Sequence, residues 1–497
     1  MLPRSESLEF SQKLKHAGKS WLRASLAGRA VLMGGLLVGA GLASAGGDVI
    51  AYIADQDQDE VSEVYRADVK TSTVTKLSSE MVAGGDAVYL DIDAKGKNVA
   101  YIADQDIDEV FELYNVDVKT GAVKKLNAPL DGTRSVEFFQ FDAKGTGVIY
   151  AADQDTTAVT ELYRADIKTS TITKLSAPMV SGGEVVFFQV DAQGKSVVYV
   201  ADQDIDDVFE LYRVDVKTGV VAKLNPNFSP GQQVQDVRID PKGKFVAYIA
   251  NQDSTATFEL YKADLKTGLA IKLNPPLVAG GNVNGLEIDG KGKAVVYVAD
   301  QDTHDTNELY RLDLKTGGVS KISGPQALDG DVSAGFQISP KGDVIVYRAD
   351  QEVDGIRELY KSDLKTSSIT KLSPPLIADG DVSSGFRLDP KGKSVAFVAD
   401  HLIDDARELF KADLKVSSTV VLNPPLPTGG SVSSFLQFDP KGKTLNYIAD
   451  QDQDEVFEAY QIDLKTGTVI QLNAPLVTDG DVFYLRIQGS PAPPLES

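Results

Sequence analysis

The chain contains no cysteine among its 497 residues, so disulfides, zinc–thiolate sites and thiol nucleophiles are excluded. It has three histidines, His16, His304 and His401, which lie far apart in the sequence. It also lacks a Gly-x-Ser-x-Gly nucleophile segment and a glycine-rich phosphate loop. Because the common catalytic patterns are missing, the sequence predicts a protein that is not an enzyme.

Basic residues are also scarce, with 50 Lys and Arg against 72 Asp and Glu, which gives a net charge of −22. Nucleic acid is excluded as a partner, because phosphates need a basic surface. The acidity is interpreted either as a device for solubility or as a surface for a cationic partner.

Long apolar runs are confined to the N-terminus. Residues 1–29 are rich in Lys and Arg, residues 30–43 are apolar, and Ala43-Ser44-Ala45 has the small residues of a cleavage site. We predict a signal peptide over 1–45, with a retained anchor as the alternative, since the run is short for a membrane span. The mature protein is expected in the periplasm, or secreted or at the cell surface, without stable membrane insertion.

The rest of the chain is dominated by one repeated segment, Ala54-Asp55-Gln56-Asp57. Near-identical copies begin every 49 or 50 residues, at Ala103, Ala152, Ala201, Ala250, Ala299, Ala349, Ala399 and Ala449. A period of this length is typical of propellers and solenoids, in which each unit buries its apolar surface against its neighbours.

Each copy predicts four short strands joined as a meander. In the fourth copy these are residues 197–201, 209–216, 220–224 and 234–239, separated by polar or Pro/Gly turns. The fold class is therefore all-β, a β-propeller of about nine four-stranded blades over residues 46–490. Residues 491–497 are expected to be a disordered tail. A surplus strand at 482–487 is expected to close the ring by pairing with the N-terminal strand at 49–54.

The repeat, with its Asp-Pro-Lys-Gly-Lys turn, Ala-Asp-Gln-Asp segment and Glu-Leu-Tyr-x-x-Asp-Leu-Lys-Thr-Gly strand and turn, resembles the TolB-like β-propeller family, which is related to WD repeats. The resemblance covers nearly all of the mature chain and implies the propeller fold. The N-terminal α/β domain of TolB is absent, as is a hydrolase domain of the kind that prolyl oligopeptidases join to a similar propeller.

Antiparallel strands alternate direction, so the Asp-Gln-Asp loops and the long Pro/Gly loops should share one face of the ring. The Asp-Pro-Lys-Gly and Asp-x-Lys-Thr-Gly turns should share the other. The sequence thus predicts one acidic face and one lysine-rich face. In the latter turn, the Asp is expected to accept backbone N–H groups.

Four of the acidic loops carry a complete Asp-x-Asp-x-Asp pattern, which resembles the first ligands of a calcium loop. The sixth position is not Gly, so these are not EF-hands, and solvated loops or salt bridges are the alternative. The predicted metal ligands, with Ca²⁺ as the cofactor, are Asp55, Asp57, Asp59, Asp104, Asp106, Asp108, Asp202, Asp204, Asp206, Asp450, Asp452 and Asp454.

Each innermost strand carries one polar residue between apolar ones. These residues are expected either to line the central channel or to pair between neighbouring blades. They are Asp91, Gln140, Gln189, Arg238, Glu287, Gln337, Arg387, Gln437 and Arg486.

The function predicted from the sequence is an exported, non-enzymatic binding or scaffold propeller. Its partner would be a protein or a small polar ligand, and calcium would stabilise its acidic face. The alternatives are a surface structural or adhesion protein and a carbohydrate-binding propeller. The single tryptophan, Trp21, lies in the predicted signal peptide, so sugar stacking would fall to tyrosines. A lyase or hydrolase ranks below these.

Overall fold

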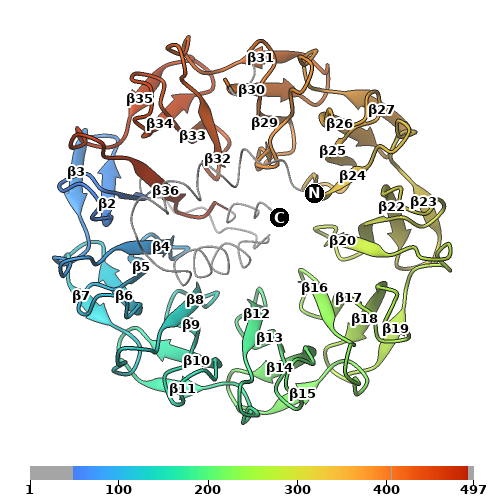
Figure 1. The fold of residues 1–497 in the computed structure, drawn as a ribbon, viewed down its shortest axis with the longest axis horizontal. Coiled ribbons are helices and arrows are strands. Elements are labelled where there is room, and N and C mark those ends of the chain that lie inside the picture. Colours follow the sequence, from blue (N-terminus) through green and yellow to red (C-terminus); the bar gives the residue numbers. More distant parts are fainter. Residues whose placement is uncertain (1–48, 404–405, 491–497) are drawn as a thin grey trace.

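The computed structural model describes residues 49–403 and 406–490. The predicted signal peptide and the predicted C-terminal tail lie outside these residues. The described residues form 36 strands in nine four-stranded antiparallel sheets, with no helix among them. The sheets stand around a common axis as blades, which confirms the nine-bladed β-propeller (Figure 1). Within the described residues, then, no helix is long and apolar enough to cross a membrane.

Every blade has the same strand order from the axis outward (Figure 1). The innermost strands are β4 (Ala87–Ile92), β8 (Val136–Phe141), β12 (Val185–Val190), β16 (Val234–Ile239), β20 (Val283–Ile288), β24 (Val332–Ile338), β28 (Arg387–Leu388), β32 (Val432–Phe438) and β36 (Val482–Ile487). The second strands are β1 (Ile50–Ala54), β5 (Asn98–Ala103), β9 (Gly147–Ala152), β13 (Ser196–Ala201), β17 (Phe245–Ala250), β21 (Ala294–Ala299), β25 (Val344–Ala349), β29 (Ser394–Ala399) and β33 (Thr444–Ala449).

The third strands are β2 (Glu63–Asp68), β6 (Glu112–Asp117), β10 (Glu161–Asp166), β14 (Glu210–Asp215), β18 (Glu259–Asp264), β22 (Glu308–Asp313), β26 (Glu358–Asp363), β30 (Glu408–Asp413) and β34 (Glu458–Asp463). The outermost strands are β3 (Thr73–Lys76), β7 (Val123–Lys125), β11 (Ile172–Lys174), β15 (Val221–Lys223), β19 (Ala270–Lys272), β23 (Val319–Lys321), β27 (Ser368–Lys371), β31 (Thr419–Val421) and β35 (Val469–Gln471).

The two ends of the described chain share one blade, as predicted. Strand β36 pairs antiparallel with β1, which gives the sheet order β3-β2-β1-β36. Arg486 of β36 also reaches the next blade, where its Nη2 lies 2.6 Å from Oδ1 of Asp91 in β4. This pairing covers the free edge of β1 and closes the ring without a covalent bond.

The interior of each blade is built on two opposed rings from the second and third strands. Tyr101 and Tyr114 stack with their centroids 5.2 Å apart, and both are buried. The Tyr114 hydroxyl donates to Glu112, which also takes the Lys125 ammonium at 2.5 Å. Burial of the Glu112 carboxylate is tolerated because it is fully paired. One blade, with Phe397 stacked on Phe410, keeps the rings without the hydroxyls.

The Asp-x-Lys-Thr-Gly turns are held as the sequence predicts. Asp117 Oδ1 accepts the N–H groups of Lys119 and Thr120, at 3.1 Å and 2.8 Å. These bonds, with the Thr120 hydroxyl, lower the pKa of Asp117. The recurring Asp of this turn therefore has a structural role.

Candidate functional site

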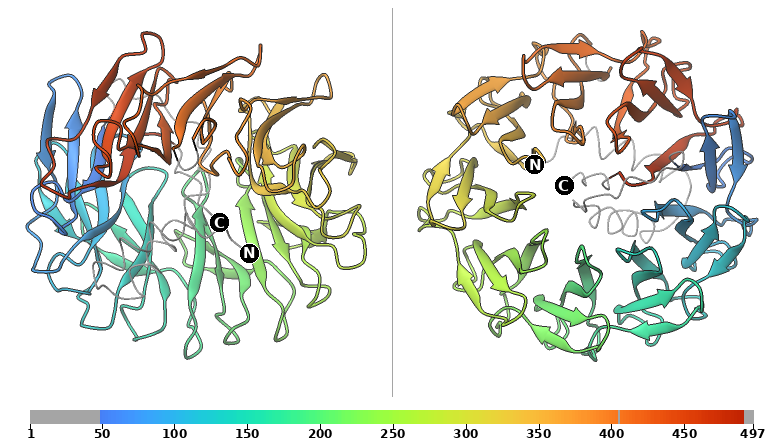
Figure 2. Two further views of the ribbon diagram at one scale, coloured as in Figure 1. Left: turned by 45° about the horizontal axis from the view of Figure 1, so that its top comes forward. Right: turned by 180° about the vertical axis from the view of Figure 1, so that it is seen from behind.

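The Asp-Gln-Asp loops and the long Pro/Gly loops lie together on one face of the ring, which confirms the predicted sorting of loops. The Val82 N–H of a long loop donates to the carbonyl of Gln105 at 3.1 Å. On the opposite face the two lysine-bearing turns meet, where the Val118 N–H donates to the Lys97 carbonyl at 2.9 Å. We call these the acidic face and the lysine face; Figure 2 shows the ring tilted, with the loops projecting from both sides.

The first aspartate of each Asp-x-Asp-x-Asp loop is buried and accepts backbone N–H groups. Asp104 is 0% exposed; its Oδ1 accepts from Asp86 N–H at 2.5 Å and its Oδ2 from Glu109 N–H at 2.9 Å. The same two bonds recur at Asp202 and Asp450, and Asp55 accepts from Asp481 N–H. One carboxylate therefore ties the short loop to the end of the long loop.

The sixth loop residue explains how this bond forms. Glu60, Glu109, Asp207 and Glu455 have φ of 59°, 63°, 60° and 63°, in the left-handed region. This conformation turns the N–H of Glu109, Asp207 and Glu455 back towards the first carboxylate. The position is occupied by Gly355 in another blade, with φ of 80°, as expected for left-handed backbone.

The second aspartate faces a different partner. Asp106 and Asp204 each lie 2.7 Å from a lysine of the outermost strand, Lys125 and Lys223. Asp57 lies 4.0 Å from Lys76, and Asp452 accepts the Tyr460 hydroxyl at 3.1 Å. These four carboxylates are exposed at the surface of their blades, where three of them lie within ion-pair distance of a lysine.

The third aspartates, Asp59, Asp108, Asp206 and Asp454, are exposed on the acidic face. In most of the predicted loops the three carboxylates therefore point to three different surroundings. Among the described residues, only two loops bring three possible ligand atoms within 4.8 Å of one another. They are Asp202 with Asp206 and Asp207, and Asp300 with His304 and Asp305. The second group was not predicted, although His304 is a blade-specific departure that could have indicated it.

Burial raises the pKa of the first aspartate in two of these loops, at Asp55 and Asp450. Removal from water raises the pKa of Asp55 to about 6, against the lowering effect of its backbone hydrogen bonds. The nearby Asp481 and Asp59 charges raise it further. Burial likewise raises the pKa of Asp450. The pKa of Asp55 thus lies closer to neutral pH than that of a solvated aspartate.

The predicted channel residues bridge consecutive innermost strands. Gln140 accepts from Val190 N–H at 3.1 Å, Gln189 from Ile239 N–H at 3.0 Å, and Gln337 from Leu388 N–H at 2.8 Å. Gln437 accepts from Ile487 N–H at 3.0 Å. Arg238 Nε donates to Glu287 at 2.8 Å, in the same manner as Arg486 and Asp91 at the ring closure. Arg387 donates to its neighbour's carbonyl, Phe386 O, at 2.9 Å. Side chains of this set thus hold neighbouring blades together around the axis.

No family model matches the sequence, and no curated protein matches it. Among solved structures, the chain is similar to Porphyromonas gingivalis dipeptidyl peptidase 4, with a TM-score of 0.55 and 12% identity over 84% of this chain and 66% of that chain. It is also similar to an oligogalacturonate lyase in complex with manganese, with a TM-score of 0.43 and 14% identity over 76% of this chain and 100% of the other. A TolB from Acinetobacter baumannii matches with a TM-score of 0.31 and 15% identity, over 71% of this chain and 82% of the other.

At these identities the similarity demonstrates the fold alone. The propeller fold that the resemblance to the TolB-like family implied is thus present, and no family model supports the family itself. The chain spans just under two thirds of the peptidase's length, so the peptidase's activity enters only as a proposal.

The prediction of a non-enzymatic binding or scaffold propeller, with its adhesion and carbohydrate-binding alternatives, is contradicted by these comparisons. The solved structure that the ring matches at a TM-score of 0.55 is a peptidase. The prediction was wrong because missing nucleophile and histidine motifs bear only on the blades themselves. They do not exclude a ring that serves an enzyme.

Calcium binding stays a prediction. Among the predicted loops, the converging carboxylates of Asp202, Asp206 and Asp207 make that loop the expected site. Millimolar Ca²⁺ should raise the melting temperature relative to EDTA, with Mg²⁺ as the control, because a ligand of the native state stabilises it. Asp206→Asn should abolish the rise, since Asp206 belongs to the converging group, whereas Asp59→Asn should preserve it. An unchanged melting temperature at millimolar Ca²⁺ would contradict the prediction.

A second prediction concerns Asp55 and pH. Its folded pKa of about 6 lies above the usual 3.8, so its contribution to stability is greatest at low pH and is lost as pH rises through about 6. Replacing it in Asp55→Asn should remove this dependence. The difference in unfolding free energy between wild type and variant should fall by about 2 kcal/mol from pH 4.5 to 7.5.

Urea unfolding at a series of pH values measures this difference. Asparagine suits the site, because Asn251 stands at the equivalent position, accepts Gln233 N–H at 2.6 Å and donates to Thr255 O at 3.1 Å. A difference that stays constant with pH would show that Asp55 titrates normally.

Proposed function

We propose that this ring is the substrate-binding propeller of a peptidase. The blades bind and orient a peptide, and the hydrolytic groups belong to a catalytic domain that is joined to the ring or docked on it. The fold shared with dipeptidyl peptidase 4 over 84% of this chain supports the enzyme class. Membership of the TolB-like repeat family is part of the same proposal and is supported by the repeat motif.

The proposed substrate, a cationic peptide, follows from one observation. Exposed carboxylates gather on a single face of the ring. The third and sixth loop positions contribute Asp59, Glu60, Asp206 and Asp207, all exposed. The long loops add further exposed carboxylates to the same face, at Asp329, Asp379 and Asp479. Such a surface attracts cations and raises their rate of association at low salt.

The lysine face strengthens this orientation. Lysines of the Asp-Pro-Lys-Gly turns, such as Lys391 and Lys441, are exposed on the opposite side of the ring. A peptide with a free amino terminus or with Lys and Arg side chains is therefore drawn to one side only. The hydrogen bonds between innermost strands keep the ring rigid while the peptide is held.

The test uses the protein purified from its source together with any chains that are bound to it. This sample is incubated with a mixed peptide library, and cleavage is measured by mass spectrometry. We expect cleavage that favours peptides with basic residues. Binding of a lysine-rich fluorescent peptide should weaken with added salt and fall about tenfold in the triple variant Asp59→Asn, Asp206→Asn, Asp454→Asn.

The matched control is the double variant Lys391→Gln, Lys441→Gln, which changes exposed charges on the lysine face and should leave binding of the basic peptide unreduced. Binding without any cleavage would overturn the peptidase assignment. Cleavage that ignores peptide charge and survives the triple variant would overturn the role of the acidic face.

A further inference from the structure

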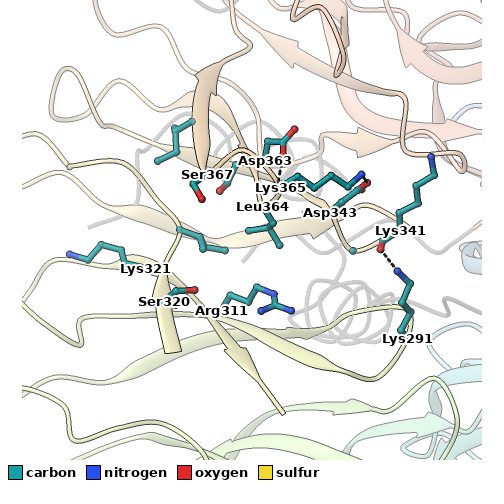
Figure 3. Close-up of a pocket in the computed structure, with 14 residues that line it drawn as sticks. Lys291, Arg311, Ser320, Lys321, Lys341, Asp343, Asp363, Leu364, Lys365 and Ser367 are labelled. Carbon is teal, nitrogen blue, oxygen red and sulfur yellow. Dashed lines mark hydrogen bonds and ion pairs between the residues drawn. The ribbon is translucent and has the colours of Figure 1, made fainter. Parts of the chain in front are cut away.

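A pocket of about 670 Å³ opens on the lysine face between two neighbouring blades, the one formed by β20–β23 and the one formed by β24–β27. Five of its lining side chains are cationic, Lys291, Arg311, Lys321, Lys341 and Lys365, and two are anionic, Asp343 and Asp363. Figure 3 shows Arg311 in the gap between the blades, with Lys291 and Lys341 at one end. In a chain of net charge −22, this local excess of positive charge is a distinct feature.

The pocket lies where, in other blades, a cationic side chain of the third strand donates a hydrogen bond to the next blade. The side chain at this position in the pocket, Arg311, has different surroundings. Arg213, at the same position of β14, donates its Nε to Ser196 and its Nη1 to the Leu265 carbonyl of the next blade. Lys361 of β26 likewise donates to the Leu414 carbonyl of the blade that follows. These side chains are committed to holding blades together.

Arg311 occupies this position in β22 and has another environment. The residue that corresponds to Ser196 is Ala294, so the hydroxyl that fixes the Arg213 guanidinium is absent. The nearest carboxylate oxygen to Arg311 belongs to Asp313 of its own strand, at 3.9 Å. The guanidinium therefore faces the pocket with its planar set of donors.

The neighbouring turn also departs from the repeat. Other blades have Asp at the start of this turn, as in Asp389-Pro390-Lys391, whereas here it reads Ser339-Pro340-Lys341. The acid has moved to Asp343, where it pairs with Lys365 at 2.5 Å. The ion pair with Lys365 therefore offsets the negative charge of Asp343.

The remaining charges leave Arg311 as the cation between the two blades, with Lys291 and the exposed Lys341 at one end of the pocket. Lys321 pairs with Glu308 at 2.7 Å, and the Lys291 ammonium donates to the Lys341 carbonyl at 2.6 Å. Asp363 Oδ1 is occupied by the N–H groups of Lys365 and Thr366. Ser320 lies directly opposite Arg311 in the β22–β23 pair, so a hydroxyl stands beside the guanidinium.

We propose that this pocket binds a phosphate group, either as the free ion or as part of a small phosphorylated molecule. Arg311 would donate two parallel hydrogen bonds to phosphate oxygens, Ser320 would donate a third bond, and Lys341 would add positive charge at the end of the pocket. The volume exceeds that of a bare phosphate and lies in the range of small-molecule sites. This site is on the opposite face from the proposed peptide-binding surface and is independent of that function.

The test is isothermal titration of the full chain with inorganic phosphate and with glucose 6-phosphate, at constant ionic strength and with acetate as a monoanion control. We expect saturable binding of at least one phosphate probe and none of acetate. If glucose 6-phosphate binds more tightly than inorganic phosphate, the site is assigned to a phosphorylated molecule. If it binds equally or more weakly, the site is assigned to the free phosphate ion.

Matched variants locate the site. Arg311→Gln should weaken binding about tenfold or more, and Arg311→Lys should restore only part of it, because Lys lacks the fork. Arg213→Gln and Lys391→Gln, the equivalent positions of other blades, should bind as wild type does, whereas Lys341→Gln should bind more weakly. Melting temperatures of all variants separate lost binding from lost folding.

Failure of the folded wild type to bind either phosphate probe would overturn the proposal. So would wild-type affinity in a folded Arg311→Gln variant. An equal loss in Lys341→Gln and Lys391→Gln would assign the effect to the general charge of the lysine face and would overturn the pocket as a site.

Discussion

The ring depends on a buried side-chain oxygen that accepts backbone N–H groups at the start of each Asp-Gln-Asp loop. Asp104 takes the N–H of Asp86, and the Asp86 side chain in turn takes the N–H of Ser62 from the preceding blade, at 2.7 Å. The same relay is made by Asp350 with Asp331, whose side chain accepts Asn307 N–H at 2.6 Å. Loss of such an acceptor would strand buried N–H groups, at about 1–3 kcal/mol for each.

This relay accounts for part of the charge of the acidic face. In some blades, as at Asp104 with Asp86, two carboxylates accept N–H groups near the same loops, whereas other blades use Asn251, Asn282 or Ser431 at these positions. More carboxylates follow at the exposed loop tips. In several blades a further carboxylate pairs with a lysine of the outermost strand, as Asp106 does with Lys125. The face that attracts cationic peptides in our proposal is thus an extension of the hydrogen bonding that shapes the loops. On the lysine face, aspartates such as Asp117 and Asp389 also accept turn N–H groups. One changed turn there, together with the missing hydroxyl at Ala294, is associated with a basic pocket.

The fold was predictable in detail because the same pattern of strands and turns recurs in all nine sequence repeats. Residues 197–201 and 234–239 were predicted as strands and are observed as Ser196–Ala201 and Val234–Ile239. Ring closure by β36 followed from one surplus strand and one missing partner. Turn chemistry was equally local, as at Asp117.

The candidate site was harder to predict, because an aspartate that binds calcium and an aspartate that accepts two N–H groups look alike in sequence. Asn251 was the discriminating signal, since an amide in the same position can keep the backbone bond but is a poorer cation ligand. The complementary charges of Arg238 and Glu287, one repeat apart, likewise indicated pairing between blades. The similarity to a peptidase was not visible in the motifs, because it lies in the arrangement of the blades and not in the sequence.

The central claim is that the first carboxylate of each loop holds the end of the long loop through a buried hydrogen bond. Amide hydrogen exchange of the native protein, resolved by mass spectrometry to the N–H groups of Asp86, Glu184 and Asp481, tests it most directly. The account predicts that these loop amides exchange as slowly as those of the innermost strands, because both open only when the blade unfolds. Exchange at the rate of exposed loop tips would contradict it and would leave those carboxylates free for another ligand.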